Sequence, residues 1–187
     1  MANTTTPEST SAVTTWAFDP SHTTVEFSAK HLMVTTVKGH FGPVTGTIQL
    51  DESDVTKSVI DATIDVAGLH SRDEKRDGHL RSADFFDAEK YPTATFKSTR
   101  IESKGGDDYV VYGDLTVRDV TSEIALNATF DGKATTPWGA EVVAFHATGK
   151  LNRKDFGLTW NVALEKGGML VGDNINISID VEATKQA

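Results

Sequence analysis

The feature that most constrains the fold of this chain is an alternation of apolar and polar residues that recurs from Trp16 onward. Successive side chains of a β-strand point to opposite faces of a sheet, so this period of two predicts strands with one apolar and one polar face. Eight such runs follow a shorter one at residues 16–18. They occupy residues 24–31, 44–50, 60–66, 93–97, 109–117, 123–130, 143–148 and 175–182.

Turn residues separate many of the runs and predict short, antiparallel connections. Tight turns are expected at residues 19–21, 104–107, 119–121 and 131–132, which are rich in Asp, Gly, Pro and Ser. Eight half-apolar strands bury their apolar faces and remove exposed edges by closing into a barrel. We therefore predict an all-β fold, an eight-stranded antiparallel barrel over residues 15–187. A two-sheet sandwich fits the same pattern and stays open as an alternative.

One charged stretch, residues 70–90, interrupts the alternation. Ser71 followed by Glu74 has the spacing of a capping box, which predicts a short helix at about residues 72–82. The Phe85-Phe86 pair after it indicates a lid or plug at one end of the barrel. At the other extreme of the chain, residues 1–14 are rich in Thr and Ser and are predicted to be a disordered tail.

Charge and composition narrow the possible partners. The net charge of −9 and pI near 5.0 argue against a nucleic-acid partner and equally against attraction to an anionic bilayer surface. There are no cysteines, which excludes disulfides and thiolate metal sites, and no apolar run near the roughly 20 residues of a spanning helix. The sequence lacks a signal-peptide pattern, so we expect a cytoplasmic protein, with a periplasmic or secreted location if a leader was removed.

Catalytic and cofactor motifs are not found, so we expect no enzyme activity, no cofactor and no metal. The alternative for a metal is that His31 and His40 meet across a hairpin. The alternative for catalysis is a lid site in which Asp77 or His79 acts as a base on a bound lipid. Ordinary pairing of helix charges is the favoured explanation of that cluster.

The apolar positions combine nine phenylalanines with small residues, and this combination has two interpretations. Small residues can interlock with large ones in a filled core, which would make the chain a structural or interaction module. They can instead leave a tunnel, because eight-stranded barrels lie at the boundary between a filled interior and one that holds a ligand. The small residues are Ala29, Gly46, Ala62, Gly113, Ala128 and Ala147.

Several separated phrases together resemble the YceI-like, polyisoprenoid-binding family over about residues 16–184. They include Trp16-x-Phe18-Asp19-x-x-His22, the run from Arg76 to Asp87, Tyr91-Pro92, Gly113-Asp114-Leu115-Thr116-Val117, Arg153-x-Asp155-Phe156-Gly157-Leu158 and Val171-Gly172-Asp173. The resemblance implies an extended, lipocalin-like barrel around an elongated apolar tunnel, with no catalytic step. The chain departs from the family at Arg118–Glu123, where the family usually reads Arg-Gly-Val-Thr-Arg-Pro.

The predicted function is to bind and sequester or carry a long-chain hydrophobic ligand such as a polyisoprenoid, an isoprenoid quinone or a similar amphiphile. A homodimer is a possible further assembly, through an exposed strand edge. Arg72, Arg76 and His79 are candidates for contact with a ligand head group, because arginine forks match phosphate oxygens. Alternation places the predicted ligand-binding side chains at Phe27, Ala29, Phe41, Ile48, Ile64, Phe96, Leu115, Val117, Leu126, Phe145, Phe156, Leu158 and Ile177.

Overall fold

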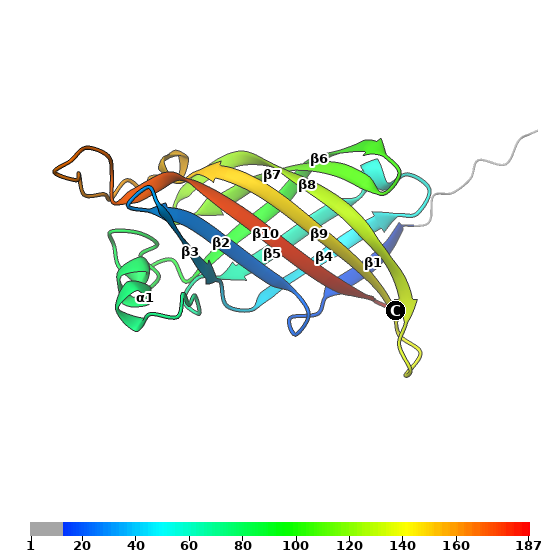
Figure 1. Ribbon diagram of the computed structural model, residues 1–187. Helices are drawn as coiled ribbons and strands as arrows, with labels where there is room; N and C mark the ends of the chain where they lie inside the picture. The colour runs from blue at the N-terminus through cyan, green and yellow to red at the C-terminus, as the bar shows by residue number, and fades with distance from the viewer. Residues whose placement is uncertain (1–12) are drawn as a thin grey trace, which may run out of the picture.

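A computed structural model describes residues 13–187, whose strands form one antiparallel sheet (Figure 1). Its ten strand segments are β1 (Val13–Phe18), β2 (Thr24–His31), β3 (Thr35–His40), β4 (Val44–Asp51), β5 (Val59–Asp65), β6 (Thr93–Gly105), β7 (Asp108–Val117), β8 (Val120–Thr135), β9 (Glu141–Asn152) and β10 (Val171–Lys185). The helical elements are α1 (Glu74–Arg81) and the short 3-10 turns η1 (Val55–Lys57) and η2 (Arg153–Phe156).

The sheet closes on itself as an eight-stranded barrel. Strands β4 to β10 pair in chain order, and β1 pairs with both β4 and β10, which completes the ring. Segments β1 and β2 both pair with β10, one after the other along its length. They therefore form one bent strand, and β3 and β4, which pair with β2 and β1, form another. The predicted antiparallel eight-stranded barrel is confirmed, and the sandwich alternative is not.

The alternation sorts side chains between the inside and the outside of this barrel. On β10, Ile175, Ile177 and Ile179 face the interior, whereas Asn176 and Ser178 between them are exposed. Two local predictions differ from the structure. The strand β3 was not predicted, and Asp131-Gly132 is not a turn but a bulge inside β8. A φ of 139° at Gly132 allows the extra residue while the strand continues to Thr135.

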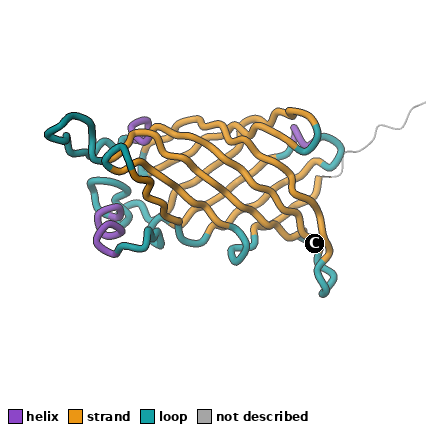
Figure 2. Tube along the Cα trace, in the orientation of Figure 1, coloured by secondary structure: helices purple, strands orange, loops and turns teal. Residues whose placement is uncertain are grey.

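The predicted helix is present as α1 and covers one end of the barrel (Figure 2). Its N-cap is Asp73, not Ser71, and the Asp73 carboxylate accepts a hydrogen bond from the Arg76 amide at 2.9 Å. Ser71 instead donates from its amide to the Asp77 carboxylate at 2.7 Å. The capping box was therefore placed two residues early, because Asp73 and Ser71 are both favourable N-caps.

The predicted tail ends earlier than expected. Strand β1 begins at Val13, where Val13 pairs with Asp51 and Thr14 with Leu50, so residues 13 and 14 belong to the barrel wall. The remainder of the predicted tail, residues 1–12, lies outside the described residues.

Close packing between strands depends on glycine at position 113. A Cβ built there lies 2.6 Å from the Lys97 carbonyl oxygen and also overlaps the Phe96 ring, which covers this glycine. We expect Gly113→Ala to lower the free energy of unfolding by about 1–3 kcal/mol, as overpacked core sites do. Urea denaturation measures this change. Gly78→Ala in α1, where nothing lies within 4 Å, is the matched control and should stabilise by up to about 1 kcal/mol; equal effects at both sites would contradict the prediction.

Candidate ligand-binding cavity

The barrel encloses a cavity of about 280 Å³ that runs from one end to the other. Val55 of η1 and Tyr109 of β7 line it at the end opposite α1. Leu80 and Phe86 line it beneath the lid formed by α1 and the segment that follows. The volume lies close to the lower end of the roughly 300–1,000 Å³ range of small-molecule pockets.

Half-buried side chains on the inner face show that the interior is not filled. Ala62, Ala128, Ala147 and Ile177 all line the cavity, yet each keeps accessible surface. In a filled core packed to the density of protein interiors these inward-facing residues would be fully buried. These four residues border the open space of the cavity.

The wall of the cavity is almost entirely aliphatic and aromatic. Its only lining residues with polar side chains, among residues 13–187, are Thr23, Ser58, Tyr109 and Arg153. Such a wall attracts a ligand through removal of apolar surface from water and places few demands on the ligand's polar groups. The chemistry therefore suits a long apolar chain.

All thirteen side chains predicted to bind the ligand line this cavity. Their contact with a ligand stays a prediction. The residues are Phe27, Ala29, Phe41, Ile48, Ile64, Phe96, Leu115, Val117, Leu126, Phe145, Phe156, Leu158 and Ile177. Lining residues that were not predicted include Phe18, at the end of the short run at residues 16–18, and Leu80 of α1, which lies outside every alternating run.

The candidate head-group residues Arg72, Arg76 and His79 lie on the lid and do not line the cavity. Arg72 is exposed, with a φ of 65°. Arg76 donates from Nε to the Ser71 hydroxyl at 2.6 Å and from Nη2 to the Ser71 carbonyl oxygen at 2.5 Å. Asp77, which is buried, accepts from the same serine. Most of this charge cluster therefore anchors the helix, and a head-group role stays a prediction.

His79 joins the lid to the long loop between η2 and β10. Its ring lies edge-on to Trp160 of that loop, with centroids 4.5 Å apart, and edge-on to Phe85 at 5.1 Å. Its Nε2 lies 2.9 Å from the Asp84 carboxylate. The aromatic contacts make the lid and the loop one packed unit over the end of the cavity.

Arg153 is a buried charged residue to which the sequence analysis assigned no role. It belongs to one of the phrases that carry the family resemblance. It is 4% exposed and donates from Nε to the Gly172 carbonyl oxygen at 3.0 Å. Its Nη1 donates to the carbonyl oxygens of Leu158 at 2.6 Å and Trp160 at 2.8 Å. Burial lowers the pKa of Arg153, while the Asp173 carboxylate, 3.3 Å from Nη2, opposes that shift. Arg153 thus clamps the loop to β10.

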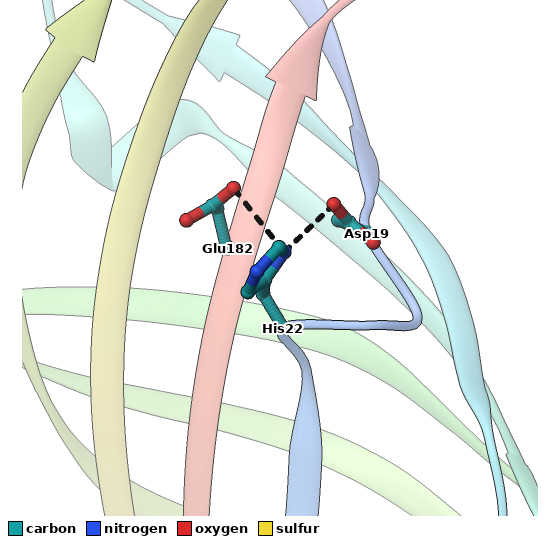
Figure 3. Close-up of side chains that lie close together, drawn as sticks. All are labelled: Asp19, His22 and Glu182. Atoms are coloured by element: carbon teal, nitrogen blue, oxygen red, sulfur yellow. Dashed lines mark hydrogen bonds and ion pairs between the residues drawn. The ribbon is translucent and has the colours of Figure 1, made fainter. Parts of the chain in front are cut away.

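Asp19, His22 and Glu182 form the one group of three potential metal ligands within residues 13–187 (Figure 3). His22 Nδ1 lies 2.9 Å from an Asp19 oxygen and 3.7 Å from a Glu182 oxygen. The group lies where β1 bends into β2, outside the cavity lining, and the Asp19 amide donates to the Glu182 carbonyl oxygen at 2.8 Å. These contacts pin the bend to β10.

The alternative metal pair does not assemble. His31 and His40 lie at opposite ends of the β2–β3 pairing, opposite Thr35 and Glu26. His40 lies instead against His70, with ring centroids 5.4 Å apart.

The His22 cluster predicts a measurable pH dependence. The hydrogen bond with Asp19, helped by Glu182, raises the pKa of His22 above 6.5, and the same hydrogen bond lowers the pKa of Asp19 below 3.8. The His22 contribution to stability is full below pH 6.5 and is lost as pH rises through its raised pKa. The Asp19 contribution is full above pH 3.8 and is lost as pH falls through its lowered pKa. The cluster therefore contributes its full stabilisation between pH 3.8 and pH 6.5, and less on either side of that window.

An NMR titration measures the His22 pKa directly. We expect a midpoint above 6.5 in the wild type and a lower one in Asp19→Asn, because the neutral amide removes the charged acceptor. A wild-type His22 midpoint at or below 6.5 would contradict the assignment.

Comparison with known proteins agrees with this geometry. Residues 16–183 match the profile of the YceI-like domain. The chain belongs to the YceI-like family. A UPF0312 protein of Staphylococcus aureus is 34% identical over 171 residues, covering 91% of this YceI-like chain and 97% of the relative.

Two solved structures place this YceI-like barrel among its structural neighbours. The Campylobacter jejuni YCEI protein is 33% identical with a TM-score of 0.70, covering 84% of this chain and 90% of that one. A polyisoprenoid binding domain from Saccharophagus degradans shares the fold with a TM-score of 0.63 at 12% identity, over 94% of this chain and all of that one. Within residues 13–187, no helix has the length and hydropathy needed to cross a membrane.

Proposed function

We propose that this protein binds and sequesters or carries a long-chain hydrophobic ligand, such as a polyisoprenoid, an isoprenoid quinone or a similar amphiphile. The observation that carries the proposal is the apolar cavity that spans the barrel beneath the α1 lid. Burial of each CH₂ group contributes about 0.8 kcal/mol, so a chain of many such groups is held without specific polar contacts. The polyisoprenoid binding domain from Saccharophagus degradans, which has the same fold, supports this class of ligand.

The position of the titratable lid residues favours binding over catalysis. A lid-based enzyme would use Asp77 or His79, but neither lines the cavity. Asp77 is occupied by Ser71, and His79 is packed between Trp160 and Phe85. A proton acceptor in either place does not face a chain held in the barrel.

Native mass spectrometry of gently purified protein tests the proposal. We expect a non-covalent species of several hundred daltons that organic solvent releases, and uptake of a fluorescent prenyl or fatty probe after extraction. The same spectra count the chains and so test the predicted homodimer. Protein that is repeatedly empty and takes up no probe would rule out the proposed function.

A further inference from the structure

Five exposed apolar side chains gather at the lid end of the barrel and form a tip patch. Leu32, Met33 and Val34 connect β2 to β3, and Val162 and Met169 belong to the loop before β10. Their exposed fractions lie between 43% and 72%. The loop is the orange-brown segment that projects beyond the left end of the barrel in Figure 1, next to the β2–β3 connection.

Hydrogen bonds join the two segments of the tip patch into one surface. The Leu32 amide donates to the Leu170 carbonyl oxygen at 2.8 Å, and the Leu170 amide donates to the Val162 carbonyl oxygen at 2.9 Å. The Met33 side chain also lies against Gly168. The five apolar side chains are therefore presented together rather than on independent loops.

The backbone at the β2–β3 turn indicates that its apolar side chains serve a purpose other than folding. Leu32 and Met33 have φ values of 52° and 63°, and the Val34 amide donates to the His31 carbonyl oxygen at 3.1 Å. Two central residues with positive φ mark the type I′ turn, which strongly prefers Asn-Gly. Leucine and methionine are unfavourable in this conformation and expose apolar surface as well. Strain of this kind concentrates at functional sites.

The tip patch lies at the mouth of the cavity. The loop that carries Val162 and Met169 runs between Leu158 and Val171, and both of these residues line the cavity. The same loop packs on the lid through Trp160 and His79.

Charge around the tip patch differs from that of the whole chain. Within residues 30–35 and 159–171 the charged residues are Lys30, Lys166 and Glu165, a positive balance in a chain with a net charge of −9. Lysines beside an apolar surface match the anionic head groups and acyl chains of a bilayer, because the lysine stem is apolar and its ammonium reaches the head groups.

We propose that the tip patch docks peripherally on a lipid bilayer that contains anionic lipids. Docking there opens a path between the acyl region and the cavity, so that an apolar ligand does not cross water. The role given to docking rests on the proposed function, because it requires that the cavity binds an apolar ligand. Binding to a bilayer is measured separately from binding of a ligand.

Sedimentation with vesicles tests the inference on the full chain. The vesicles are phosphatidylcholine alone, or a 3:1 mixture of phosphatidylcholine and phosphatidylglycerol. We expect the wild type to bind the mixed vesicles more strongly, and less so at high salt. Two variants remove apolar surface from the patch: Leu32→Asn with Met33→Gly, and Val162→Ser with Met169→Ser. Each should reduce vesicle binding by about tenfold, the loss expected for the side chains removed.

The design separates docking from folding and from ligand binding. Leu32→Asn with Met33→Gly installs the preferred turn, so its Tm should equal or exceed that of the wild type while vesicle binding falls. Trp138→Ser, which removes a 90% exposed side chain from the β8–β9 hairpin, should bind vesicles as the wild type does. Both patch variants should retain the ligand that native mass spectrometry detects in the wild type. If the wild type carries no ligand in those spectra, that result counts against the proposed function and not against docking.

Three results would overturn the inference. They are wild-type protein that stays in the supernatant with both vesicle types, patch variants that sediment as the wild type does, and patch variants that convert a dimer to a monomer without any vesicle binding. The last result would assign the tip patch to a second copy of the chain.

Discussion

Replacing Ala147 with phenylalanine is expected to lower the affinity for a long-chain ligand by about 100-fold while the barrel stays folded. Ala147 of β9 faces the cavity and pairs with Ala128 on β8 and Ile179 on β10. It is half-buried because open space lies in front of it. The added phenyl ring therefore enters the tunnel rather than the packed wall, and it displaces several CH₂ groups of any chain that threads past.

Fluorescent-probe titration measures the affinity, and thermal unfolding shows whether the fold survives. Ala125→Phe is the matched control, because Ala125 lies on β8 three residues before Ala128 but is exposed on the outer face. It should leave the affinity for the probe unchanged. If Ala147→Phe binds the probe as the wild type does, the ligand does not pass the middle of the barrel, and the proposed binding mode is wrong.

Sequence reasoning was most successful where one physical rule acts alone. The period of two follows from strand geometry, so it predicted the inward side chains of β10 and the other long strands without knowledge of their partners. It missed β3, whose inward face carries Thr35, Val37 and Gly39, so that only one large apolar side chain signals this six-residue strand. The predicted number of eight barrel strands is right. Two of these strands each consist of two segments, β1 with β2 and β3 with β4.

The choice between a tunnel and a filled core could not be made from the sequence. The sequence at Ala62 or Ala128 is the same whether or not a large side chain fills the space in front of the alanine. That outcome depends on how far apart the opposite walls lie, which closure of the sheet determines. The polar contacts of the lid were equally hidden, because Ser71, Asp73 and Asp77 compete for the same few donors and only the folded backbone decides among them.

The buried guanidinium of Arg153 leads to the second large prediction. Replacing Arg153 with methionine should lower the free energy of unfolding by about 3–5 kcal/mol, the range for breaking a buried charged network. The variant leaves the carbonyl oxygens of Gly172, Leu158 and Trp160 without their donor. An unpaired buried acceptor costs about 1–3 kcal/mol, which supports an effect of this size. The loop over the lid end should become more mobile as well, because Arg153 is one of two side chains that tie it to β10, the other being Asn161.

Urea denaturation measures the stability, and hydrogen exchange of residues 158–172 measures the local effect. Lys154→Met is the matched control, because Lys154 carries the same charge one residue away and pairs with Asp173 at 2.8 Å but is 47% exposed. An exposed pair contributes about 0–1 kcal/mol, so this variant should change little. Arg153→Lys keeps the charge and should still lose most of the stability, because an ammonium cannot reproduce the planar fork that reaches Gly172 on one side and Leu158 and Trp160 on the other. Full stability in Arg153→Lys would mean that charge, not donor geometry, holds the loop.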